Sequence, residues 1–241
     1  MGDGRLYAWN AESGELVYSN QFTPRLLGGC PVADHKRLVL VEDNGGAGYL
    51  YDLQTHQTEL IEEHMPKQPV AWKASLDGRL VCYVTTNDQV KVYDATSKRT
   101  RFIAKLADPP IDIVAAEFSP DSRWLAVGSS GGQIQVWNVG TGRPVGNPLP
   151  RYSADTWKFS FSADGKSLVT YAMDNTARIW NIATSREMVS GLRLNWFLND
   201  HTQWTILPPD GNSVLEGAGE QAIHVVRLPT LAEIDRPQAP R

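Results

Sequence analysis

Cysteine is scarce in this sequence, and long apolar runs are lacking. The two cysteines, Cys30 and Cys82, stand in separate apolar segments, where a buried thiol is expected rather than a disulfide or a metal pair. No run of about 18 apolar residues occurs, which excludes a membrane-spanning helix. The N-terminal segment lacks both an apolar signal core and the Ser or Thr that a myristoylation motif places at its sixth position. We therefore expect a cytoplasmic protein that binds no membrane.

The charge balance shows no excess of cations. The 241 residues include 23 Lys and Arg against 27 Asp and Glu, which gives a net charge of -4. Nucleic-acid-binding domains usually carry a basic stripe, whereas the densest basic stretch here is only Lys98-Arg99-Thr100-Arg101. We expect this stretch to lie on the solvent-facing side of an outer strand. Nucleic acid is therefore not expected as a partner.

Motifs for metal binding and catalysis are also lacking. The histidines are single, with no His-x-x-x-His or Cys-x-x-Cys spacing, and no Gly-x-Ser-x-Gly elbow occurs. The Gly-rich run at 44–48 is followed by neither a helix nor a Lys-Ser or Lys-Thr pair. We interpret that run as a tight turn between strands rather than a phosphate-binding loop. The sequence thus predicts no cofactor, no metal and no enzymatic activity.

Repetition is the most prominent feature of the chain. Six alternating apolar runs each end in an aromatic or aliphatic residue followed by Asn, Asp or Arg, at intervals of 42 to 46 residues. This period is close to that of one four-stranded propeller blade. The six pairs are Trp9-Asn10, Tyr51-Asp52, Tyr93-Asp94, Trp137-Asn138, Trp180-Asn181 and Val226-Arg227.

An Asp recurs in the turn between the first and second strands of the repeat. Asp closes such turns by accepting hydrogen bonds from its own backbone, so a recurrence at one structural position favours turn formation over acid or base catalysis. Turn signals of this density leave little room for a helix of about 11 residues, and segment 55–65 is expected to be an outer strand and loop. Five such turns imply five blades with all inner strands present: Asp34, Asp77, Asp121, Asp164 and Asp210.

Two of the repeats carry a family resemblance. Residues 118–121 (Phe-Ser-Pro-Asp) with Trp137-Asn138, and 161–165 (Phe-Ser-Ala-Asp-Gly) with Trp180-Asn181, resemble WD40 repeats, and the similarity extends over nearly the whole chain. The resemblance implies an all-β fold, a β-propeller of four-stranded antiparallel blades. It also implies a noncatalytic scaffold that presents loops to protein or peptide partners.

One element of the family pattern is missing. In the family a Gly-His pair opens many repeats, and its His joins Asp, Ser or Thr, and Trp in a hydrogen-bond network. No Gly-His pair occurs in this sequence, and Pro109 and Tyr152 stand at two of the usual places. We therefore expect most blades to lack the full network.

The first repeat contains only its second half. Segment 5–9 is a predicted third strand and 15–18 a predicted outer strand, so we expect about five complete blades plus a half-blade, with a propeller at 1–235 and a tail at 236–241. We expect the chain to be the C-terminal part of a longer signalling protein and to serve as its regulatory or targeting part, with about 60 residues of propeller and a further domain upstream. Two alternatives stay open: the last blade pairs with 5–9 to close a six-bladed ring, or two chains complement one another.

We expect partners to bind on the narrow face of the propeller, where each outer strand leads into the next inner strand. In the family that this chain resembles, that face often binds partners. The link at 151–156 and the following Trp157 combine Arg, Tyr and Trp, the residue types enriched at binding hot spots. Trp9, Trp137 and Trp180 are expected to pack between blades instead. The candidate residues are Arg151, Tyr152, Asp155 and Trp157 and, by repeat equivalence, His64, Asn87, Asp88 and Asp174.

A second functional class is kept as an alternative. Segment 4–16 is similar to a quinoprotein-type propeller repeat, a group that includes quinone-dependent dehydrogenases. Such an enzyme would need this pattern in most blades, and only the first copy has it.

Overall fold

The computed structural model describes the strands and most of their turns. The described residues are 5–9, 13–21, 26–32, 36–42, 46–63, 72–85, 89–106, 112–150, 156–173, 176–193, 205–206, 213–218 and 222–227. They contain 21 strands and no helix, and hence no helix long and apolar enough to cross a bilayer. The chain divides into two units, Met1–Arg101 and Phe102–Arg241, which are described in turn.

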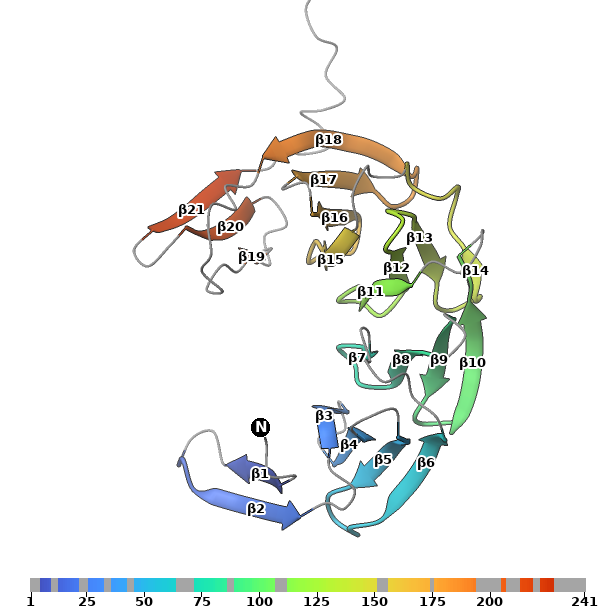
Figure 1. Ribbon diagram of the computed structural model, residues 1–241, viewed down its shortest axis with the longest axis vertical. Coiled ribbons are helices and arrows are strands. Elements are labelled where there is room, and N and C mark those ends of the chain that lie inside the picture. The colour runs from blue at the N-terminus through green and yellow to red at the C-terminus, as the bar shows by residue number, and fades with distance from the viewer. Residues whose placement is uncertain are drawn as a thin grey trace, which may run out of the picture. The chain divides into compact units, whose positions relative to one another are not determined.

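The first unit contains a two-stranded sheet and two four-stranded sheets (Figure 1). The two-stranded sheet pairs β1 (Arg5–Trp9) with β2 (Leu16–Gln21). The second sheet has the order β3 (Leu26–Pro31), β4 (Arg37–Glu42), β5 (Gly48–Asp52), β6 (Thr58–Glu62). The third has the order β7 (Trp72–Ala74), β8 (Leu80–Val84), β9 (Val90–Asp94), β10 (Arg99–Ala104), and the end of β10 crosses into the second unit.

The second unit continues the same pattern. Its first sheet has the order β11 (Ile113–Phe118), β12 (Trp124–Ser129), β13 (Ile134–Asn138), β14 (Arg143–Pro144). The next has the order β15 (Thr156–Phe161), β16 (Ser167–Ala172), β17 (Thr176–Asn181), β18 (Arg186–Arg193). The last sheet has three described strands, β19 (Thr205–Ile206), β20 (Ser213–Ala218) and β21 (Ala222–Arg227).

These sheets confirm the predicted all-β fold of antiparallel propeller blades. The aromatic or aliphatic residue of each repeated pair is the last or the penultimate residue of a third strand, β1, β5, β9, β13, β17 or β21, and segment 58–62 is an outer strand, as expected. The predicted half-blade is the β1–β2 sheet. Four blades are complete within the described residues, and the fifth shows its three inner strands. The predicted tail and its boundary at residue 235 lie outside the described residues.

The predicted Asp turns are present in three blades with one hydrogen-bond pattern. In the β11–β12 turn, Ser119 Oγ donates to Asp121 Oδ1 at 2.6 Å, Asp121 Oδ1 accepts the Arg123 N–H at 3.1 Å, and Ser119 Oγ accepts the Trp124 N–H at 3.0 Å. The same set of bonds recurs in the β7–β8 and β15–β16 turns, through Ser75 with Asp77 and Ser162 with Asp164. These aspartates therefore build turns, as predicted; Asp34 and Asp210 lie outside the described residues.

A second turn recurs after the third strands. There the final Asp or Asn side chain accepts backbone N–H groups two or three residues further on, as Asp94 Oδ1 does from Thr96 and Ser97 at 3.0 Å each. The residue four positions after that Asp or Asn has a left-handed backbone conformation in every described case. These residues are His56, Lys98, Gly142 and Ser185.

Each unit has its own apolar core between neighbouring blades. In the first unit, Val39, Val41, Leu50, Val81 and Tyr83 belong to one buried cluster that joins the β3–β6 and β7–β10 sheets. In the second unit, the corresponding cluster joins the β11–β14 and β15–β18 sheets and includes Trp180, which is fully buried. Trp137 is also buried, so these two indoles lie inside the protein as predicted, and the side chain of Trp9 lies outside the described part of the structure. Cys82 is buried in β8, in the environment expected for it.

Candidate protein-interaction surface

The strand pairing defines a common end of each blade, which we call the rim. The rim consists of the turns between second and third strands (residues 43–47, 85–89, 130–133 and 173–175) and the strand ends beside them. In the β15–β18 blade, Thr156 at the start of β15 pairs with Ala172 at the end of β16. In the β3–β6 blade, Gly48 pairs with Glu62 at the end of β6. Links from outer to inner strands therefore leave and enter at the rim, as predicted.

Most of the predicted partner-binding residues lie outside the described residues. These are Arg151, Tyr152, Asp155, His64, Asn87, Asp88 and Asp174. The strand register places the start of β15 and the end of β16 at the same end of one blade, because Thr156 pairs with Ala172. His64, Asn87 and Asp88 belong to the first unit and the other candidates to the second.

Trp157 is the one candidate that falls within a described element. It lies in β15 at a register shift between Thr156 and Lys158. The same shift occurs at Leu27 in β3 and at Val114 in β11. A bulge of this kind changes the direction of a side chain, but its recurrence shows that it belongs to the repeat rather than to the candidate surface alone.

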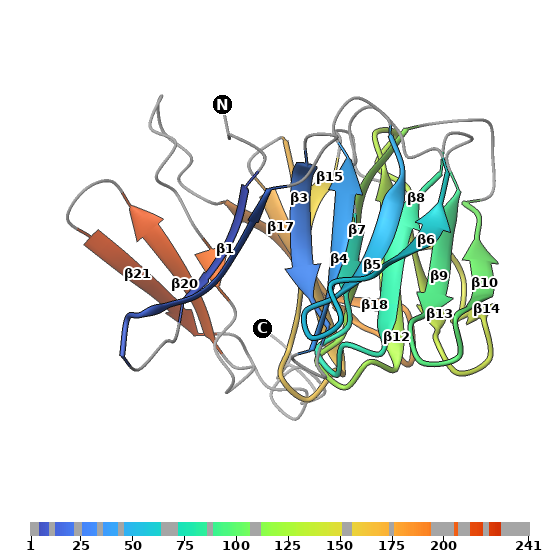
Figure 2. The same cartoon turned by 90° about the horizontal axis from the view of Figure 1, so that it is seen from below.

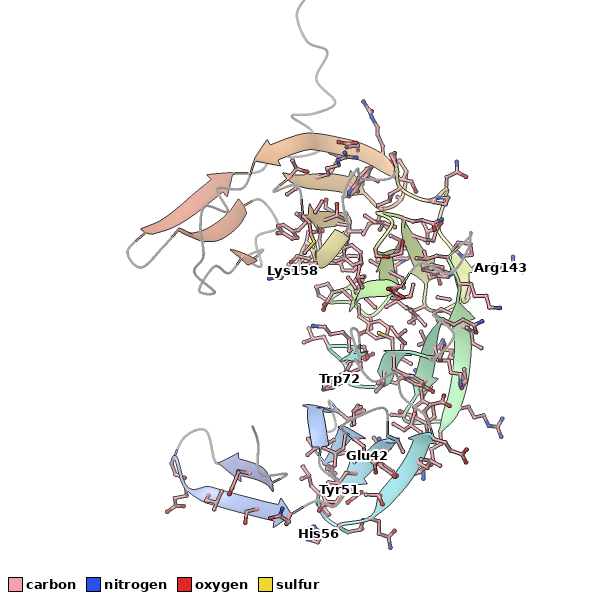
Figure 3. The ribbon with its side chains drawn as sticks, viewed as in Figure 1. Glu42, Tyr51, His56, Trp72, Arg143 and Lys158 are labelled. Atoms are coloured by element: carbon pink, nitrogen blue, oxygen red, sulfur yellow. The ribbon has the colours of Figure 1, made fainter. Side chains whose placement is uncertain are left out.

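The rim turns are held by the side chain that follows or ends the second strand. Glu42 Oε2 accepts the Ala47 N–H at 2.9 Å, and the Glu42 N–H donates to the Ala47 carbonyl at 3.0 Å (Figure 3). The equivalent Thr85 bonds through Oγ1 to both the N–H and the carbonyl of Gln89. A hydrogen bond with Glu42 raises the pKa of Tyr49. These bonds close the base of each turn, where the second strand ends and the third begins.

A polar cluster supports the rim of the first unit. Glu62, at the end of β6, accepts hydrogen bonds from the Tyr83 hydroxyl at 3.1 Å and from the Lys91 ammonium. Burial raises the pKa of Tyr83, and the Glu62 carboxylate raises it further. The cluster ties β6 to the neighbouring blade two residues before His64, and sequence reasoning missed it because no local motif links the three residues.

An exposed apolar side chain marks the rim of the second unit. Met173 is 67% exposed and directly precedes the candidate Asp174. An exposed methionine is an adaptable contact for a partner.

The opposite end of the first unit carries a groove that sequence reasoning also missed. Its volume is about 450 Å³, and its walls include Lys36, Arg37, Asp52, Glu59 and Lys98. Figure 2 shows β3–β5 and β7–β9 running between the same two ends of this unit. The sequence signal was available, because Lys36 and Lys98 both belong to turns that the repeat places at this end. Within the described residues, no group of three His, Cys, Asp or Glu side chains is placed to hold a metal ion.

Repeated antiparallel blades with hydrogen-bonded Ser-Asp turns define a WD-repeat propeller. The model of the "WD domain, G-beta repeat" family matches residues 105–138 and 147–181. These two segments are therefore WD40 repeats, and the low identities of the chain to WD-repeat proteins fit a divergent array.

Two curated relatives and one solved structure illustrate the similarity. The chain is 25% identical to WD repeat-containing protein 1 of Xenopus tropicalis over 76% of its own length and 31% of the relative. It is 24% identical to Protein LST8 homolog of Drosophila melanogaster, over 92% of this chain and 72% of that protein. The crystal structure of the computationally designed Ika8 protein shares the fold, with a TM-score of 0.69 at 17% identity over 94% of this chain and 66% of the other.

Proposed function

We propose that this protein is a noncatalytic interaction scaffold that binds protein or peptide partners through the rim. WD40-repeat proteins generally act as protein-interaction scaffolds, and the WD40 repeats of this chain support the same general role. The observation that carries the proposal is the hydrogen bonding at the base of two rim turns, where Glu42 bonds to Ala47 and Thr85 to Gln89. A preorganised surface loses little conformational entropy when it binds.

The finer proposal is that Arg151, Tyr152 and Trp157 provide the principal contact, within a larger regulatory or targeting assembly in the cytoplasm. Arg, Tyr and Trp contribute disproportionately to binding free energy at protein interfaces. In this proposal Asp155, Asp174 and Met173 surround that contact; the pairing of Thr156 with Ala172, the neighbours of Asp155 and Met173 in the chain, supports it.

The test is a variant with Arg151, Tyr152 and Trp157 all replaced by alanine. Partners recovered by affinity purification from the native cell are quantified by mass spectrometry, and the tightest is then titrated against purified wild-type and variant protein. We expect binding to weaken by about 2 kcal/mol or more, roughly thirty-fold. Unchanged affinity with unchanged thermal stability would remove this patch from the proposal.

The matched control replaces three exposed side chains away from the rim, Leu76, Arg143 and Lys166. Arg143 lies on the outer strand β14 (Figure 3), and Leu76 and Lys166 lie in turns at the opposite end of the blades. We expect this control to retain wild-type affinity, because surface residues outside an interface contribute little to binding. Equal loss in both variants would indicate a stability defect rather than a binding site.

A further inference from the structure

The groove at the end of the first unit opposite the rim is built between two blades. Lys36 and Arg37 come from the start of β4, Asp52 and Glu59 from the β5–β6 hairpin, and Lys98 from the β9–β10 turn of the next blade. Arg37 Nη1 donates to the Ala95 carbonyl at 2.9 Å, and Lys98 Nζ lies 2.5 Å from Glu59 Oε2. Both contacts join the two blades across the groove.

The walls of this groove are fixed by hydrogen bonds of the turn. Asp52 Oδ1 accepts the N–H groups of Gln54 and Thr55 at 2.8 Å each, and these bonds lower the pKa of Asp52. The Leu53 N–H donates to the Lys36 carbonyl at 2.7 Å. The groove is therefore present before any ligand binds, which lowers the entropic cost of binding.

The charge of the groove differs from that of the whole chain. Three cations line it against two carboxylates, whereas the chain as a whole has a net charge of -4. Asp52 is engaged by backbone N–H groups, and Glu59 is engaged by Lys98. The exposed Arg99 continues the positive charge along β10, whereas Arg101, two residues further on, lies 3.6 Å from Asp94.

We propose that this groove binds an acidic, extended peptide segment of a partner protein. Carboxylates of such a segment would approach Lys36 and Arg37, beside the Lys98–Glu59 ion pair, and the exposed Thr55, Gln57 and Thr58 side chains would bond its backbone amides. A peptide can place neutral residues beside Asp52 and Glu59. A nucleic acid cannot, because its phosphates form an unbroken series of negative charges. The inference adds a second surface to the proposed scaffold and rests on that function only in that the ligand is a protein.

The experiment measures fluorescence anisotropy of a labelled peptide of alternating Glu and Ser, about ten residues long, titrated with the full chain. The comparison probe replaces every Glu by Gln. We expect the Glu peptide to bind at least about ten-fold more tightly than the Gln peptide, with the difference shrinking as salt rises and screens the charges. Equal binding of the two peptides, or no binding of either, would overturn the proposal.

Lys36→Glu is the main variant, because the backbone bond from Leu53 survives the substitution. Lys98→Gln provides a second variant that leaves Lys36 in place. Each is expected to weaken the Glu peptide about ten-fold or more, whereas Lys166→Glu, an equally exposed lysine of the second unit, changes affinity less than about two-fold. A similar loss in all three variants would show diffuse charge attraction and overturn the proposal, as would tighter binding of single-stranded DNA than of the peptide.

Each set of variants is also measured in the other binding assay, which distinguishes a rim site from a groove site. The triple rim variant is expected to bind the Glu peptide normally, and Lys36→Glu is expected to retain the partner that the rim binds. If the rim variant binds its partner as tightly as the wild type, only the rim proposal is overturned and the groove proposal is unaffected. Loss of peptide binding in the rim variant would instead overturn the groove proposal.

Discussion

Ser122 holds a left-handed backbone conformation in a turn where two other blades carry glycine. Its φ is 57°, against 56° for Gly78 and 67° for Gly165 at the equivalent positions. Its hydroxyl is buried and makes no hydrogen bond to the described part of the chain. A side chain in this conformation carries strain that glycine avoids.

Ser122→Gly is therefore expected to stabilise the protein by about 1 kcal/mol. Relief of strain and removal of a buried, unbonded hydroxyl outweigh the added flexibility of glycine in the unfolded chain. The shift is measured as the midpoint of urea unfolding. The reciprocal variant Gly78→Ser should lower that midpoint, and a loss of stability in Ser122→Gly would contradict the interpretation.

Trp180 retains one bond of the family's structural network. Its indole Nε1 donates to Thr170 Oγ1 at 2.8 Å in a fully buried position. The register places Leu40, Tyr83 and Val127 at the position of Thr170 in the other complete blades. Leu40 and Val127 carry no hydroxyl, and the Tyr83 hydroxyl donates to Glu62 instead, in line with the absence of Gly-His pairs from the sequence.

At the scale of the element, packing against the next blade restricts which residue β12 can carry at position 128. A Cβ added to Gly128 would overlap the ring of Phe159 on β15. Other blades carry Val41, Val84 and Tyr171 at the same register position. The glycine is present because the neighbouring phenylalanine fills the space, and β11 and β15 are in contact.

Gly128→Ala is expected to destabilise the protein by about 1 to 3 kcal/mol, because overpacking of a filled core forces side chains out of their preferred rotamers. Urea unfolding of the single variants and of Gly128→Ala with Phe159→Leu forms a double-mutant cycle. In the Phe159→Leu background the alanine should cost clearly less. Additive losses would show that the two residues do not share this space.

At the scale of the whole molecule, several turn aspartates together make the stability of the fold depend on pH. Burial acts to raise the pKa of Asp94, but hydrogen bonds from Ser97, Arg79 and Thr96 outweigh it and lower the pKa. The pKa of Asp164 is also lowered, because its hydrogen bonds with Ser162 and Lys166 outweigh burial. Backbone hydrogen bonds from Thr55 and Gln54 lower the pKa of Asp52.

The free energy of unfolding should therefore decrease below about pH 4. A carboxyl whose pKa is lower in the folded state stabilises the protein above its unfolded pKa, and that contribution is lost as pH falls through the folded pKa. Chemical denaturation across about pH 3 to 7 measures the trend. Asp94→Asn keeps a side-chain oxygen for the turn, as Asn138 and Asn181 do in other blades, and should lower stability by about 1 kcal/mol at neutral pH.

The same variant provides the check on the mechanism. Asp94 Oδ2 lies 3.0 Å from Arg79 Nη2, and this ion pair disappears in Asp94→Asn. The stability of the variant should therefore depend less on pH below pH 4 than that of the wild type. Parallel pH profiles for the two proteins would show that Asp94 does not contribute to acid unfolding.

Part of this molecule was predictable from short-range chemistry. The Asp77, Asp121 and Asp164 turns and the ends of the third strands follow from local residue preferences and period-two alternation, so they were predicted correctly. The bulge at Trp157 was not predicted, because a register shift depends on the strand opposite. The Glu62, Tyr83 and Lys91 cluster was not predicted either, because 21 and 29 residues separate its bonded members.

The sequence alone determined the all-β architecture and the blade repeat, since turn residues and alternating apolar positions act over a few residues. Tertiary structure alone decided which side chains of neighbouring blades meet. It placed Gly128 against Phe159 and Arg37 against Ala95, and it formed the groove beside Lys98. These contacts depend on how packed sheets fit together, a property that no local pattern encodes.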